Sequence, residues 1–146
     1  MSRSLKHLCP RFRPLAFELI ARCIENRVWL IIIDTLRTPA EQAEYLRVGA
    51  SRTSNSLHLP QTSCSTCGHV GGLSHAMDAA PILDLNEVNI VKAIQWNVKH
   101  PAWKFYGGVA KELGLVWGGD WGWDFSHVQM PKTRYDSGVP AVPRVT

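Results

Sequence analysis

The sequence predicts an α+β fold in which helices pack on a small, largely antiparallel sheet within a single domain. Two segments carry apolar residues at helical spacing, and several short runs are rich in β-branched and aromatic residues. The chain has 146 residues, 45% of them hydrophobic, which is enough for one compact core and too few for two. No internal repeat divides the chain, so we expect residues 1–146 to fold as one domain.

The first part of the chain is expected to contribute a helix, a strand and a second helix. Residues 14–27 place apolar side chains on one helical face, and residues 28–33 (VWLIII) form a short β-branched run that predicts a buried strand. Residues 38–41 (TPAE) have the form of a capping box with proline at the first helical position. A second helix should therefore begin there and run to about Val48, with Gly49 as its stop.

The rest of the chain is expected to alternate loops with short elements. Residues 49–73 show no periodicity and predict a long irregular loop, of which 60–73 is an inserted part. Short strands are expected at 75–80, 115–117 and 125–130, the last two paired around a Gly-Gly-Asp turn. Further helices are expected at 88–98, where the pattern is ambiguous, and from Pro101 to Gly114; residues 131–146 form an irregular tail.

Composition limits the classes of partner. The net charge of +4, with arginines concentrated in the first half, favours an anionic partner, but no aromatic-basic interleaving indicates nucleic acid. The longest apolar run is far below the roughly 20 residues that cross a bilayer, so no membrane insertion is expected. The first 14 residues are interrupted by charges and prolines, unlike a secretory signal, which predicts a cytoplasmic product. Its four cysteines are then expected to be thiols or metal ligands.

Three separate sequence segments contain the residue types of a catalytic metal site. Asp124 precedes His127 by three residues on a short apolar run, and His58 and Asp78 lie upstream. Two histidines and one aspartate are a common ligand set for a catalytic zinc that keeps one position open for water. Each residue alone has an ordinary explanation, such as a hydrogen-bonded histidine in a half-buried strand. Their combination favours a zinc hydrolase.

Four phrases in the same order resemble a known family. They are residues 49–59 (GASRTSNSLHL), 75–81 (HAMDAAP), 111–115 (KELGL) and 117–127 (WGGDWGWDFSH), preceded by 37–42 (RTPAEQ). Together they resemble the D-Ala-D-Ala-carboxypeptidase-like zinc peptidases, specifically the phage endolysin branch of L-alanyl-D-glutamate peptidases. The resemblance covers roughly residues 15–130.

The resemblance implies a role for each matching residue. His58, Asp78 and His127 would bind zinc, Asp124 would be the general base, and Arg37 would hold a substrate carboxylate. A carboxylate beside the attacking water can pass its proton to the leaving amine, and a guanidinium can grip a carboxylate with two parallel hydrogen bonds. Ser56 and Trp121 are expected to contact the substrate as well. Packing around a small core is the alternative for Trp121.

The spacing between His58 and Asp78 departs from the family. Residues 59–77 intervene, about 13 more than the family has, and such an insertion costs little because loop-closure entropy grows with the logarithm of length. His69 is a rival ligand, although it lacks the Asn-Ser-x-His-Leu surroundings of His58. Within the insertion, Cys64, Cys67 and His69 have the spacing of a zinc knuckle, and a disulfide or two free thiols are the alternatives to a second, structural zinc.

The resemblance implies an endolysin that hydrolyses the L-Ala–D-Glu bond of the peptidoglycan stem peptide during host cell lysis. Such a protein would be a monomer that accumulates in the host cytoplasm and reaches the cell wall once a holin opens the membrane. A D-Ala-D-Ala carboxypeptidase or dipeptidase is the alternative within the same chemistry. A non-catalytic basic protein with a zinc-knuckle loop is the alternative from another class.

Overall fold

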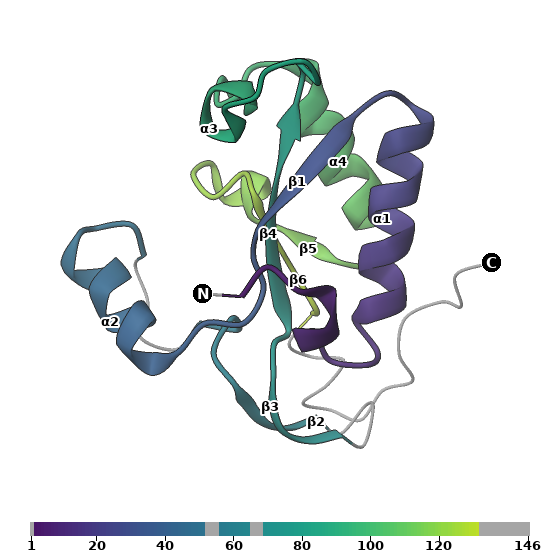
Figure 1. Cartoon of the computed structure of the whole chain (residues 1–146). Helices are drawn as coiled ribbons and strands as arrows, with labels where there is room; N and C mark the ends of the chain where they lie inside the picture. Colours follow the sequence, from purple (N-terminus) through teal and green to yellow (C-terminus); the bar gives the residue numbers. More distant parts are fainter. Residues whose placement is uncertain (1, 52–55, 65–68, 132–146) are drawn as a thin grey trace.

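Four antiparallel strands form the main sheet, in the order β1-β4-β6-β5 (Figure 1). The computed structural model describes residues 2–51, 56–64 and 69–131. The strands are β1 (Trp29–Asp34), β4 (Ala76–Ile82), β5 (Val116–Trp117) and β6 (His127–Gln129). The central strand β4 pairs Ala80 with Ile31 of β1 and Asp78 with His127 of β6. This register is what places a carboxylate beside an imidazole.

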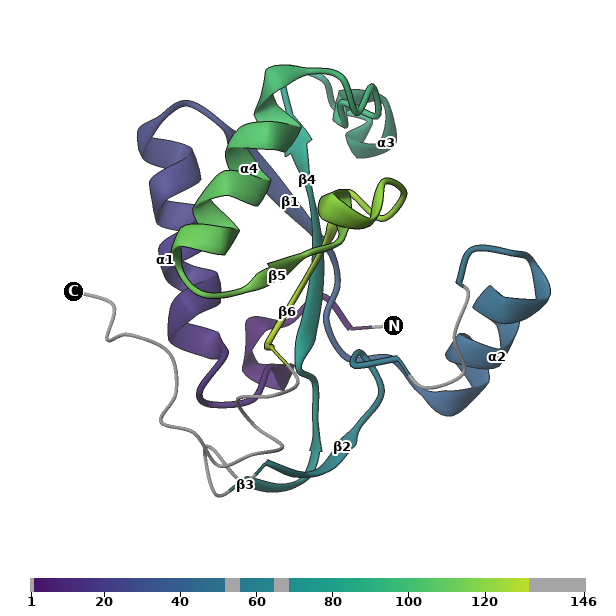
Figure 2. The same ribbon diagram turned by 180° about the vertical axis from the view of Figure 1, so that it is seen from behind.

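Two helices cover one face of this sheet, α1 (Arg13–Glu25) and α4 (Pro101–Glu112) (Figures 1 and 2). From α1 the sheet-facing side chains recur every three or four residues, at Leu15, Leu19 and Cys23, all at most 2% exposed. From α4, Trp103 and Tyr106 are the largest fully buried side chains of the core. The described residues form a single compact domain, so the predicted α+β architecture with helices on a small antiparallel sheet is confirmed.

The helix α2 (Pro39–Arg47) lies apart from the two core helices, with Gln42 as its only buried residue (Figure 1). Its start is the predicted capping box: Thr38 Oγ1 accepts from the Glu41 amide at 3.1 Å, and Glu41 Oε1 accepts from the Thr38 amide at 3.3 Å. Gly49 follows the helix with φ +77°, the left-handed conformation that ends many helices. A helix with so little buried surface depends on these caps, because packing supplies little of its stability.

The inserted segment is more regular than its sequence predicts. Residues 60–73 are not an irregular loop throughout, since β2 (Gln61–Cys64) and β3 (His69–Leu73) pair antiparallel as a separate two-stranded sheet. The segments QTSC and HVGGL lack the apolar alternation that identifies a strand, which is why the sequence predicts a loop where the two backbones pair. Residues 65–68, which connect β2 to β3, and the expected tail from residue 132 lie outside the described residues.

The segment at 88–98 also differs from the sequence-based expectation. The ambiguous segment 88–98 contains only one helical turn, α3 (Ile90–Ala93), after which Ile94 bridges to Ile82 at the end of β4. Short 3-10 turns, η1 (Leu5–His7) and η2 (Gly118–Trp121), complete the elements. In the described part of the chain, every helix is too short or too polar to cross a membrane.

The packing of Trp117 on Gly107 gives a test of the core. A Cβ at Gly107 would overlap the Trp117 indole, whereas a Cβ at the adjacent Gly108 meets nothing within 4 Å. We expect Gly107→Ala to lower the free energy of unfolding by about 1–3 kcal/mol, as overpacking does. The matched control Gly108→Ala should raise it by about 0.5–1 kcal/mol, because alanine is the better helix former. Urea denaturation measures both, and equal effects of the two substitutions would contradict the packing.

Candidate metal centre

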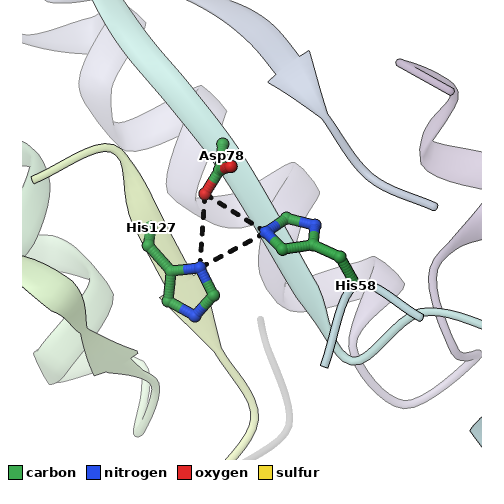
Figure 3. Close-up of side chains that lie close together, drawn as sticks. All are labelled: His58, Asp78 and His127. Atoms are coloured by element: carbon green, nitrogen blue, oxygen red, sulfur yellow. Dashed lines mark hydrogen bonds and ion pairs between the residues drawn. The ribbon is translucent and has the colours of Figure 1, made fainter. Parts of the chain in front are cut away.

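Three side chains from distant parts of the sequence meet on one side of β4 (Figure 3). Asp78 and His127 are cross-strand neighbours in the β4–β6 register, so their side chains project from the same face of the sheet. His58 comes from the loop before β2, and backbone hydrogen bonds hold that loop in place. The Arg37 amide donates to the His58 carbonyl at 2.9 Å, and the His75 amide donates to the Leu57 carbonyl at 2.9 Å.

The three side chains place one atom each at the corners of a nearly equilateral triangle. His58 Nε2 lies 3.3 Å from His127 Nδ1, and these two nitrogens lie 3.2 Å and 3.3 Å from Asp78 Oδ1. Tetrahedral zinc with ligand bonds of about 2.0–2.2 Å puts neighbouring ligand atoms about 3.3–3.6 Å apart. The separations therefore fit three ligands of one zinc ion.

Hydrogen bonding at the back of each imidazole leaves a lone pair facing this triangle. His58 Nδ1 lies 2.8 Å from the Thr35 carbonyl, and His127 Nε2 lies 2.8 Å from Gln129 Oε1. Both partner oxygens only accept, so these nitrogens carry the hydrogens, and His58 Nε2 and His127 Nδ1 are the unprotonated ones.

Asp78 Oδ1 completes a set of acceptors that have no hydrogen between them. This buried oxygen accepts no hydrogen bond from the described residues. Three acceptors converging without a donor repel one another unless a cation lies among them. The donor set of two imidazoles and one carboxylate, together with this unsatisfied oxygen, fits a divalent metal such as zinc.

Burial and charge act against each other at this centre. Burial opposes ionisation of Asp78, but the neighbouring His58 and His127 outweigh it and hold the pKa of this carboxyl below its usual range. Burial likewise opposes protonation of His127, yet the adjacent Asp78 carboxylate raises the pKa of this imidazole. The site is therefore built to hold Asp78 as a carboxylate next to positive charge, which is the state a metal ligand requires.

Asp124 lies beside the triangle and outside it. Its Oδ2 is 3.8 Å from His127 Nδ1, and its backbone carbonyl accepts from the His127 amide at 3.2 Å. The loop that carries it is closed by the Trp117 indole, which donates to the Phe125 carbonyl at 2.7 Å. Burial and the negative charge of Asp78 raise the pKa of Asp124. A half-buried carboxylate at this distance suits proton transfer better than ligation.

Arg37 is buried next to Asp78, on the side of the Oδ2 oxygen. Its Nε donates to Asp34 Oδ2 at 2.8 Å, its Nη1 donates to Gln42 Oε1 at 2.6 Å, and its Nη2 lies 3.5 Å from Asp78 Oδ2. The guanidinium also lies over the Tyr45 ring, 4.3 Å from its centroid. Arg37 therefore orients Asp78 through the oxygen that faces away from the triangle. Its binding of a substrate carboxylate stays a prediction.

The two other residues expected to contact substrate occupy different positions. Ser56 is buried, and its Oγ accepts from the His58 amide at 3.2 Å, so it supports the turn that presents His58. Trp121 is 45% exposed, and its ring centroid lies 5.4 Å from that of His127. Trp121 can thus contact a molecule bound at the metal centre, whereas Ser56 affects the centre only by positioning His58. Substrate contact stays a prediction for both.

The supporting residues Thr35, Asp34, Gln42 and Gln129 were not identified from the sequence. Gln129 alternates with His127 along β6, and this spacing of two was the only available signal. Thr35 contributes a backbone carbonyl, which no side-chain pattern reveals. The rival ligand His69 lies in β3 and its side chain is outside the described part, as are the side chain of Cys64 and the whole of Cys67.

Gln129 gives a test of the supporting contacts. We expect Gln129→Leu to weaken zinc binding roughly 10- to 100-fold, the usual cost of losing a partner that orients a ligating histidine. The physical reason is that His127 loses the acceptor that fixes its tautomer. Competition with a chromophoric chelator measures the affinity. Gln95→Leu is the control, because among the described residues the Gln95 side chain bonds the Asn97 amide alone. Equal zinc affinity of Gln129→Leu and wild type would contradict this role.

The fold and the site together define a class: an α+β domain with a candidate three-ligand metal centre and an adjacent carboxylate on its sheet. Among solved structures, this chain is similar to the L-Ala D-Glu endopeptidase ChiX of Serratia marcescens, with a TM-score of 0.60 and 24% sequence identity. The similarity covers 92% of this chain and 90% of that one, so the two share a fold over nearly their whole length. No family model and no curated protein matches the sequence.

Proposed function

We propose that this chain is a zinc-dependent peptidase that hydrolyses the L-Ala–D-Glu bond of peptidoglycan stem peptides. The observation that carries the proposal is the triangle of unprotonated acceptors formed by His58, Asp78 and His127, with Asp124 beside it. The choice of bond rests on the fold shared with a protein described as an L-Ala D-Glu endopeptidase. The four phrases that resemble the family support both parts.

Each residue of the site then has a task in hydrolysis. Zinc bound by the three ligands would supply a Lewis acid that polarises the scissile carbonyl and activates a water molecule. Asp124 accepts the proton of the attacking water at its carboxylate and donates it to the departing amine. Arg37, paired with Asp34, keeps Asp78 oriented and ionised, and Thr35 and Gln129 orient the imidazoles and fix their tautomers. Trp121, whose ring lies beside that of His127, is placed to contact the substrate.

The test is digestion of purified peptidoglycan by the zinc-loaded protein, followed by mass spectrometry. The proposal expects fragments with a new N-terminal D-Glu, released at the L-Ala–D-Glu bond. Loss of a terminal D-Ala instead would identify the carboxypeptidase or dipeptidase. Zinc binding with no hydrolysis of either bond would contradict the peptidase and favour a binding protein.

A biological role in phage lysis is part of the same proposal. A monomeric endolysin held in the host cytoplasm would act on the wall after a holin permeabilises the membrane. Expression of the chain in bacteria, with and without a co-expressed pore-forming holin, tests this. Lysis that requires both proteins supports the endolysin role, whereas lysis or its absence irrespective of the holin contradicts it.

A further inference from the structure

A cavity of about 140 Å³ lies directly beside Asp124 and outside the metal triangle. Four aromatic side chains line it, Trp96, Trp103, Trp123 and Phe125, together with Val98. Trp96 and Val98 come from the segment after α3, and Trp103 comes from the start of α4. Trp123 and Phe125 come from the loop between η2 and β6. Figures 1 and 2 show α3 and η2 on the same side of β4, at the side not covered by α1 and α4. Asp124 is shared between this aromatic pocket and the metal centre.

The floor of the aromatic pocket is fixed and its rim is open. Trp103 is 1% exposed, and its indole donates to the Gln95 carbonyl at 2.8 Å. Trp96 stacks on Trp103 with ring centroids 6.3 Å apart, and Phe125 meets Trp103 edge-on at 6.5 Å. At the rim, Trp96 and Trp123 are 55% and 40% exposed. Preformed concave sites with exposed aromatic rims are typical of ligand binding.

The charge of the pocket limits what it can bind. Among the described residues that line it, Asp124 is the only ionisable one, and none is a lysine or an arginine. A carboxylate placed there would be repelled by Asp124 and find no cation. An uncharged group with apolar faces and a few hydroxyl or amide groups can instead stack on the indoles and bond the polar atoms at the edge.

We propose that the aromatic pocket binds the uncharged, glycan-side half of the substrate, the N-acetylmuramoyl group joined to L-Ala. This inference rests on the proposed function, because it assigns the two halves of that substrate to two sides of the metal centre. The D-Glu side of the scissile bond carries a free carboxylate, which Asp124 disfavours. The glycan side carries no charge, because its lactyl carboxyl is already in amide linkage. Trp96 is the principal stacking residue, since its ring is both exposed and supported by Trp103.

Two substrates that differ only in the glycan test the proposal on the full-length, zinc-loaded protein. One is an N-acetylmuramoyl-L-Ala-D-Glu peptide, and the other is the same peptide with acetyl in place of the muramoyl group. We expect wild type to show a KM roughly 2- to 12-fold lower for the muramoyl peptide, the range that one aromatic contact supplies. Trp96→Ala should abolish this difference and leave the KM of the acetyl peptide unchanged, while Trp96→Phe should retain most of it.

Controls separate this inference from the proposed function. Leu85→Ala removes another exposed apolar side chain that does not line the pocket, and it should leave both KM values unchanged. Equal changes for both substrates in Trp96→Ala, or no change in either, would overturn the proposal. So would a preference of wild type for a peptide with a free, cationic L-Ala amine.

Binding can also be measured without hydrolysis. Titration of N-acetylmuramoyl-L-alanine amide, which is uncharged and has no L-Ala–D-Glu bond, should shift the indole N–H resonance of Trp96 and give saturable binding that Trp96→Ala loses. If wild type binds this ligand at Trp96 but cleaves neither peptide, the pocket assignment stands and the proposed function fails. If wild type cleaves the L-Ala–D-Glu bond and the ligand leaves Trp96 unaffected, the pocket assignment fails and the function stands.

Discussion

His127→Ala is expected to lose both zinc and hydrolytic activity. The substitution removes one corner of the ligand triangle and leaves Asp78 Oδ1 buried beside a single imidazole. The loss of zinc affinity should exceed the roughly 10- to 100-fold that follows loss of a supporting partner, because a ligand itself is gone. Metal content after dialysis and peptidoglycan digestion measure the two effects.

Folding has to be separated from metal binding in this variant. His127 lies in β6, so thermal denaturation of the metal-free proteins should accompany the metal analysis. His7→Ala is the matched control, because in the described part of the chain the ring of this exposed histidine bonds the Ser2 side chain alone. Unchanged zinc content in a folded His127→Ala protein would contradict the assignment of this ligand.

Asp124→Ala is expected to retain zinc and to lose about 10²- to 10⁴-fold in kcat, the range that general acid–base catalysis contributes. The carboxylate stands 3.8 Å from His127 Nδ1 and outside the triangle of ligand atoms, so its removal leaves the metal-binding atoms in place. Asp124→Asn tests the same point with the shape preserved. Steady-state kinetics and metal analysis on the same preparations measure the separation.

A neighbouring aspartate provides the control for that result. Asp120 lies in η2, four residues before Asp124, and pairs with Lys111 at the surface, 3.2 Å from its Nζ. Asp120→Ala should leave kcat and zinc content unchanged. Full activity in Asp124→Ala would remove the base assignment, and loss of zinc from it would show that Asp124 acts as a ligand instead.

The parts of the fold that local chemistry determines were predicted from the sequence. The capping box at Thr38 and Glu41 satisfies backbone amides within four residues, so its sequence pattern and its structure coincide. The run at 28–33 became β1 with a shift of one residue, but its apolar side chains are half-buried rather than fully buried as predicted. Strands β2 and β3 pair although neither has alternating apolar residues, so no periodic pattern in the sequence predicts them.

The candidate site, too, was predicted only in part: its ligands were identified from the sequence, and the contacts that orient them were not. His58, Asp78 and His127 were identified because each lies in a distinctive phrase, although their convergence depends on the register of β4 with β6 and on a loop anchored to Arg37. The contacts that orient them come from a backbone carbonyl at Thr35 and from Gln129, whose residue types are common at any surface. The aromatic pocket was missed for a related reason: Trp96 and Trp123 are 27 residues apart and only the tertiary fold joins them.

The most direct test is the position of zinc in crystals of the full-length protein, located by anomalous diffraction at the zinc absorption edge. The account predicts a single strong peak bonded to His58 Nε2, Asp78 Oδ1 and His127 Nδ1, with Asp124 close by and not coordinated. A peak bonded instead to the cysteines at 64 and 67, or the absence of a peak from the triangle in zinc-saturated crystals, would contradict it.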